Sequence, residues 1–61
     1  MKLIDVEKHL RQHECDKVRE GGNHTIWKNT KNGKITSVPR HKEIKDLLVK
    51  NICKQLDIPS P

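Results

Sequence analysis

Aromatic side chains are almost absent from this 61-residue chain, which has one Trp and no Phe or Tyr. Only 31% of the residues are hydrophobic, so the core of a folded domain must be thin. A chain of this length buries only about 60% of the surface that its unfolded form exposes. We therefore expect a single domain over residues 1–61, with an unfolding free energy of a few kcal/mol.

Long hydrophobic runs are absent as well. No uninterrupted apolar run exceeds three residues, which excludes a transmembrane helix and the apolar core of a signal peptide. Charged residues also recur throughout the first ten positions, which is untypical of an export signal. We expect a cytoplasmic protein that does not use a membrane as its partner.

Cysteine occurs only twice, at Cys15 and Cys53. A reducing compartment favours two free thiols over a disulfide. His9, His13 and Cys15 lie close together in the sequence and suggest zinc. However, the chain has no C-x-x-C pair, and two histidines four residues apart are common on helices. The sequence therefore predicts neither a metal site nor a cofactor.

Basic residues, by contrast, are abundant. Lys and Arg number 13 against 8 Asp and Glu, which gives a formal charge of +5 and a pI near 9.5. Such an excess attracts polyanions, nucleic acid first. Charge alone leaves an acidic protein or an anionic membrane surface open as alternatives.

Hydrophobic periodicity predicts two helices, at about 2–14 and 44–56. In the first, Leu3, Val6 and Leu10 fall on one stripe. In the second, the apolar residues expected to share a face are Ile44, Leu47, Leu48, Ile52 and Leu56. The residue before Pro59 disfavours helical geometry, so the helix ends there and leaves the tail 57–61.

Between the helices, β-branched residues separated by turn residues predict three short strands, at about 16–20, 24–29 and 34–38. Gly21-Gly22 provides the first bend. Asn32-Gly33 is a strong hairpin signal, since both residue types tolerate positive φ. Pro39 ends the third strand because it has no N–H to donate.

This order predicts an α+β fold of two layers, α-β-β-β-α, with a three-stranded antiparallel sheet and both helices on one face. The other face of the sheet is then open. Alternation along the second strand places His24 and Lys28 on one side and Trp27 on the other. We expect Trp27 in the core rather than as a platform for RNA bases, and His24 on the open face.

His24 follows two glycines and an asparagine in the stretch REGGNHTIWK. Histidine changes its protonation state near neutral pH, as general acid–base catalysis requires. In RNA cleavage such a group takes the proton of the 2′-hydroxyl, and cations stabilise the charge on phosphorus. From the residues alone, a structural or merely exposed histidine remains the alternative, and Asn23 is equally suited to capping the turn. The residues expected to contact RNA are Arg19, Gly22, Asn23, Lys28, Lys31, Lys34, Arg40 and Lys42.

Three stretches, VREGGNHTIWK (18–28), SVPRHKEIKDLL (37–48) and KNICKQLDI (50–58), together resemble the HicA family of mRNA interferase toxins. The shared pattern is a glycine or asparagine turn ending in His, a strand, a Pro-Arg-His exit and a helix ending in Lys-Gln. Two positions depart from it. The usual Gly-Ser-His reads Gly22-Asn23-His24, and a glycine early in the last helix is replaced by Leu47.

The resemblance implies a fold similar to the double-stranded RNA-binding domain and ribonuclease activity with one catalytic histidine, which maps to His24. It also implies a HicB-type antitoxin as a protein partner that masks this site. His41, in the Pro-Arg-His exit, is interpreted as structural or RNA-contacting rather than catalytic.

The leading hypothesis is a metal-independent, ribosome-independent endoribonuclease that cleaves mRNA and acts as the toxin of a type II toxin–antitoxin system. The alternative is a non-catalytic RNA-binding module of the same fold. A DNA-binding protein is the weakest candidate, because the last helix offers little beyond Asn51 and Gln55 to read base edges.

Overall fold

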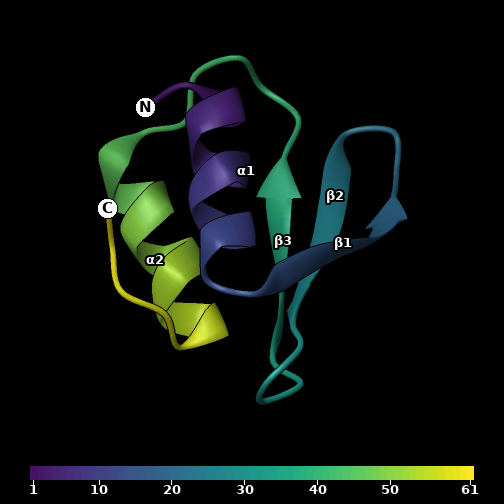
Figure 1. Ribbon diagram of the computed structural model, residues 1–61. Helices are drawn as coiled ribbons and strands as arrows, with labels where there is room; N and C mark the ends of the chain where they lie inside the picture. The colour runs from purple at the N-terminus through teal and green to yellow at the C-terminus, as the bar shows by residue number, and fades with distance from the viewer.

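The computed structural model describes residues 1–61, which form two helices and three strands (Figure 1). In chain order the elements are α1 (Leu3–Gln12), β1 (Cys15–Glu20), β2 (His24–Asn29), β3 (Ile35–Pro39) and α2 (Asp46–Leu56). This is the predicted α-β-β-β-α order. Neither helix has the length and apolar character needed to cross a membrane.

The strands form one antiparallel sheet in the order β1-β2-β3, and both helices lie on the same side of it (Figure 1). The predicted two-layer architecture is therefore confirmed. The register between β1 and β2 shifts between Lys17 and Arg19, so Val18 is an extra, unpaired residue in the edge strand. Such a bulge twists an edge strand and disfavours pairing with another chain.

Trp27 lies at the centre of the core and is fully buried against the helix layer. Two cations cover its ring: the Arg11 guanidinium lies 5.1 Å from the ring centroid and the Lys17 ammonium 5.8 Å. Cations in these positions are attracted to the electron-rich face of an indole. The prediction that Trp27 is a core residue and not an exposed stacking platform is confirmed.

Helix α1 uses the predicted stripe, since Val6 and Leu10 are buried and Leu3 is half-buried against the core. For α2 the predicted face is partly wrong. Leu47 is 72% exposed and Leu48 37% exposed. The buried residues of the helix are Val49, Ile52, Cys53 and Leu56.

The error has a geometric cause. Positions 49, 52, 53 and 56 follow the i, i+3, i+4, i+7 spacing of one helical face. Ile52 and Leu56 also fit a stripe that begins at Leu48, so the sequence carries two overlapping patterns. The helix begins at Asp46, and Ile44 enters the core from the preceding loop instead of from the helix.

The predicted β2–β3 hairpin is present, but its turn differs from a two-residue Asn-Gly turn. Five residues, 30–34, connect the strands, and only Gly33 has a positive φ, of 76°. Asparagine side chains hold the connection: Asn29 Oδ1 accepts the Lys31 N–H at 2.9 Å and Asn32 Oδ1 accepts the Lys34 N–H at 2.8 Å. Asparagine favours such turns because its side chain imitates a backbone acceptor.

The first residues of the chain are fastened to the loop that precedes α2. The Leu3 N–H donates to the Lys42 carbonyl at 2.8 Å, and the Ile44 N–H donates to the Met1 carbonyl at 2.7 Å. Lys2 and Glu43 form an antiparallel bridge. These contacts place the start of α1 beside the segment that follows β3, although the two are about forty residues apart in the sequence.

Candidate functional site

His24 is the first residue of β2 and follows the tight turn 21–23. The Gly21 N–H donates to the His24 carbonyl at 2.8 Å and closes this turn. A Cβ atom at Gly21 would lie 3.0 Å from that carbonyl oxygen, whereas one at Gly22 would meet nothing within 4 Å. The space around the turn therefore favours glycine at position 21 but not at position 22, because a side chain at position 21 would push against the backbone of His24.

Arg40, the residue after β3, is hydrogen-bonded to the same turn. Its main-chain N–H donates to the Asn23 carbonyl at 3.0 Å, and its guanidinium Nη1 donates to the Gly21 carbonyl at 3.0 Å. The register pairs His24 with Pro39, the last residue of β3. The turn and the start of β2 are thus held by β3 and by the residue that follows it.

The imidazole of His24 is exposed on the open face of the sheet, as the alternation predicts. None of the side-chain hydrogen bonds in the molecule involves this ring. Both ring nitrogens are accordingly free to exchange a proton with a bound molecule. A histidine held at its backbone and free at its ring is suited to general acid–base chemistry.

Two of the predicted cations share the open face with His24. Lys28 lies four residues further along β2, on the same side of the strand, and is exposed. Arg19 pairs with Ile26, and paired residues point to the same face, so Arg19 also lies on this side. The structure thus places Arg19, Lys28 and His24 on one surface of the sheet.

Lys31 and Lys34 lie at the other end of the sheet, in the β2–β3 connection. The length of β2 separates them from His24 by roughly 17 Å at the usual rise per residue of a strand. Both are also engaged with carboxylates: Lys31 Nζ lies 3.4 Å from Glu14 Oε2, and Lys34 Nζ lies 4.0 Å from Asp57 Oδ2. The structure does not bring these two lysines to the His24 turn.

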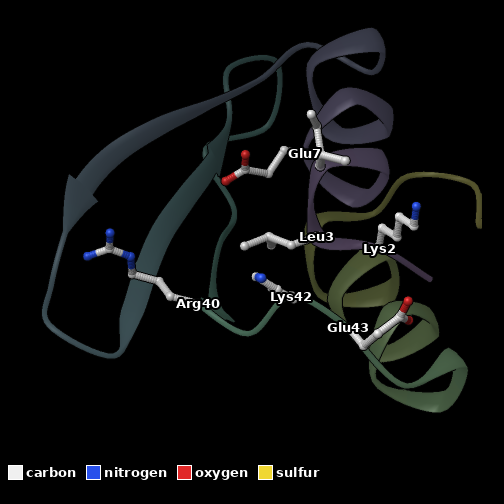
Figure 2. Close-up of a pocket in the computed structure, with 7 residues that line it drawn as sticks. Lys2, Leu3, Glu7, Arg40, Lys42 and Glu43 are labelled. Carbon is white, nitrogen blue, oxygen red and sulfur yellow. The ribbon is translucent and has the colours of Figure 1, made fainter.

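Arg40 and Lys42 line a cavity of about 630 Å³ between the first turn of α1 and the segment that leaves β3 (Figure 2). The residues around it are Lys2, Leu3, Ile4, Glu7, Arg40, Lys42 and Glu43. Lys2 is absent from the predicted contact residues, because its neighbourhood depends on contacts between residues about forty positions apart. No local pattern in the sequence could have identified it.

The residues considered for zinc are not assembled into a site. The His9 and His13 rings lie with their centroids 4.5 Å apart and their planes tilted by 56°, and His9 Nε2 lies 2.7 Å from the Pro59 carbonyl oxygen. Cys15 is buried in the core, with its thiol 3.7 Å from the His13 carbonyl. No group of three His, Cys, Asp or Glu side chains in the molecule is arranged to hold a metal ion.

His41 follows Arg40 in the loop after β3 and is exposed. It makes no side-chain hydrogen bond within the chain, in contrast to Arg40. Its exposure close to the His24 turn makes it a natural comparison residue for His24.

Comparison with known proteins identifies one family. The model of the family described as the HicA toxin of bacterial toxin–antitoxin systems matches residues 5–58. The match includes the turn 21–23, all three strands, α2 and most of α1. No curated protein and no solved structure matches the chain.

Proposed function

The chain belongs to the HicA toxin family of bacterial toxin–antitoxin systems, and on that premise we propose that it is an endoribonuclease that cleaves mRNA in the cytoplasm with His24 as its general acid–base residue. Cleavage requires neither a metal ion nor the ribosome. The observation that carries the proposal is the turn 21–23, which fixes the backbone of His24 and leaves its imidazole exposed and unbonded.

In this reaction His24 accepts the proton of a ribose 2′-hydroxyl. The 2′ oxygen then forms a bond to the adjacent phosphorus, and the bond from phosphorus to the 5′ oxygen breaks. The leaving oxygen takes a proton from the imidazolium or from water. The products carry a 2′,3′-cyclic phosphate and a 5′-hydroxyl. A positioned histidine contributes about 10²- to 10⁴-fold to the rate of such a step.

The surroundings of His24 support an anionic substrate. Arg19 and Lys28 share its face of the sheet, and Arg40 is bonded to its turn. Cationic groups stabilise the negative charge that accumulates on the phosphorane-like transition state. Main-chain groups of the glycine turn are also accessible to a sugar–phosphate backbone, because Gly22 and Asn23 are exposed.

Family membership implies an antitoxin as partner. We take this partner to be a HicB-type protein that covers the open face and masks His24. A chain of formal net charge +5 attracts an acidic protein, and this association should weaken as the salt concentration rises. Stable association independent of salt would argue against a charge-based interface.

The deciding experiment uses purified protein, a defined mRNA without ribosomes, and EDTA. His24→Ala should bind RNA with unchanged affinity and lose cleavage. His41→Ala is the matched control, since it removes an exposed histidine that is interpreted as non-catalytic: at saturating RNA its cleavage rate should stay within about twofold of wild type, and any loss of an RNA contact should change KM alone. The cyclic phosphate on the upstream fragment identifies the chemistry.

A different result would identify the alternative, a non-catalytic RNA-binding module. If wild type and His24→Ala bind RNA equally and neither cleaves it, His24 has no chemical role. Cleavage that stops with EDTA, or that requires ribosomes, would contradict the proposed mechanism while leaving the family assignment intact.

A further inference from the structure

The cavity beside the first turn of α1 has an unbalanced set of charges. Three cations line it, Lys2, Arg40 and Lys42, together with two carboxylates, Glu7 and Glu43. A count of charges alone would suggest near neutrality. The ion pairs of the molecule show that the two signs are not equally available.

Both carboxylates are engaged by cations that do not line the cavity. Glu7 Oε2 lies 3.7 Å from Lys17 Nζ, which itself rests over the Trp27 ring. Glu43 Oε2 lies 3.3 Å from the amino group of Met1. Neither carboxylate is paired with a cation of the cavity.

The three cations, in contrast, form no ion pair with any side chain. Lys2 and Lys42 make no side-chain hydrogen bond, and Arg40 uses only Nη1, to the Gly21 carbonyl. The remaining donors of the guanidinium are free. Unpaired cations around a concave surface focus a positive potential that attracts anions, phosphate among them.

The cavity also has an apolar side. Leu3 is half-buried and packs against the core, while Ile4 is 71% exposed beside it. Figure 2 shows Leu3 near the middle of the lining residues, with Arg40 on the side of the sheet and Lys2 on the side of the helices. A volume of about 630 Å³ is within the range of sites that hold small organic molecules. Apolar surface next to free cations fits a nucleotide, which has a flat base and an anionic phosphate.

Arg40 connects this cavity to the His24 turn. It lines the cavity, and it is bonded to Gly21 and Asn23, the residues on either side of the bend before His24. Arg40 is therefore in contact with both the cavity and the turn that carries His24.

We propose that the cavity between α1 and the β3–α2 segment is an RNA subsite that holds a nucleotide flanking the scissile phosphate. Lys2, Arg40 and Lys42 bind its phosphate, and Leu3 and Ile4 contact its ribose or base. This proposal rests on the proposed function, because a scissile phosphate exists only if the protein cleaves RNA. The cavity then provides a second point of contact with the substrate, in addition to the His24 turn. Two contact points align the RNA backbone over His24, where a single one would let it rotate.

The test uses a fluorescein-labelled 2′-O-methyl octanucleotide of mixed sequence, which resists attack by the 2′ oxygen. Its affinity is measured by anisotropy for wild type, for Lys2→Gln/Lys42→Gln, and for the control pair Lys8→Gln/Lys50→Gln. The control removes the same charge from exposed helix positions outside the cavity. Circular dichroism establishes that both double variants remain folded.

The cavity variant should bind on the order of tenfold more weakly at moderate salt, and its salt slope should fall by about 1.4, two phosphate contacts at about 0.7 each. The control pair should stay within about twofold. In wild type the Ile4 methyl resonances should shift on addition of the oligonucleotide, and in the cavity variant they should not. Equal weakening of both double variants would overturn the subsite in favour of diffuse attraction.

Further results would distinguish the RNA subsite from a site for an acidic protein segment, and from the proposed nuclease function. If hexaglutamate binds with the same lysine dependence and the oligonucleotide does not, the cavity accepts an acidic protein segment and the RNA subsite is refuted. If wild type cleaves RNA and the cavity variant cleaves like the control pair, the subsite fails while the nuclease stands. Lysine-dependent RNA binding without any cleavage by wild type would retain the subsite and remove the proposed function.

Discussion

The Arg40 guanidinium donates to the Gly21 carbonyl at 3.0 Å, which ties the residue after β3 to the turn before β2. The Arg40 main-chain N–H adds a second bond to this turn, at Asn23. The edge of the site is therefore held by a side chain whose charge also faces the neighbouring cavity. A substitution at Arg40 that keeps the positive charge can therefore distinguish its role in holding the turn from its role in attracting RNA.

Arg40→Lys keeps the positive charge but loses the planar donor that reaches Gly21. We expect kcat for RNA cleavage to fall about tenfold, because small displacements of a catalytic group are costly. KM should change by less than about threefold, since the charge is retained. Equal losses from Arg40→Lys in kcat and in RNA affinity would indicate a binding role without positioning.

Gly21→Ala should distort the turn, since its Cβ would lie 3.0 Å from the His24 carbonyl oxygen. We expect a loss of about 1 kcal/mol in unfolding free energy, together with weaker cleavage. Gly22→Ala is the matched control, because its Cβ meets nothing within 4 Å. Urea unfolding and the cleavage assay measure both effects. Indistinguishable behaviour of the two variants would contradict the close approach.

The exposure of Leu47 and the burial of Val49 predict opposite consequences for the same polar substitution. Val49 is 3% exposed, and Leu47 is 72% exposed. Val49→Ser should lower the unfolding free energy by about 2 kcal/mol, through lost apolar burial and a buried hydroxyl. Leu47→Ser should remain within about 0.5 kcal/mol. Thermal unfolding of the two variants decides, and a larger loss at Leu47 would restore the face predicted from sequence.

The two buried thiols make stability depend on pH in the alkaline range. Burial raises the pKa of Cys15, with the Asp16 carboxylate as a second cause. Burial also raises the pKa of Cys53, with the neighbouring Cys15 as a second cause. The unfolded chain then loses its thiol protons first as pH rises, so the contribution to stability is complete below about pH 9 and declines above it.

The measurement is urea unfolding between pH 8 and pH 10.5. Each thiol contributes a decline of at most about 1.4 kcal/mol per pH unit within its window. Cys15→Ala/Cys53→Ala should have a shallower alkaline decline, even though its stability at neutral pH is lower. Parallel curves for wild type and the double variant would show that the two thiols do not cause the decline.

Local sequence patterns were sufficient for several features of the molecule. Apolar spacing in α1, alternation in β2 and the positions of the two glycine turns depend on neighbours within a few residues, and these features appear as predicted, although the second turn is longer than a two-residue Asn-Gly turn. Alternation in particular placed Trp27 inside and His24 outside, because successive strand residues point to opposite faces. The resemblance to the HicA family also rests on short motifs of this kind, and the family model matches residues 5–58.

Tertiary contacts decided the remainder. The sequence of α2 contains two overlapping apolar stripes, and packing against the sheet determines which of them is buried. In the structure Val49 and Cys53 are buried, whereas Leu47 and Leu48 are exposed. Some cations that are near His24 in sequence are far from it in the structure. Lys31 and Lys34 lie beyond the opposite end of β2, which separates them from His24 by the length of the strand. Lys2, distant in sequence, joined Arg40 and Lys42 through backbone bonds between residues 1–3 and 42–44. Sequence proximity fixes spacing along an element, whereas only the packed fold determines which elements meet.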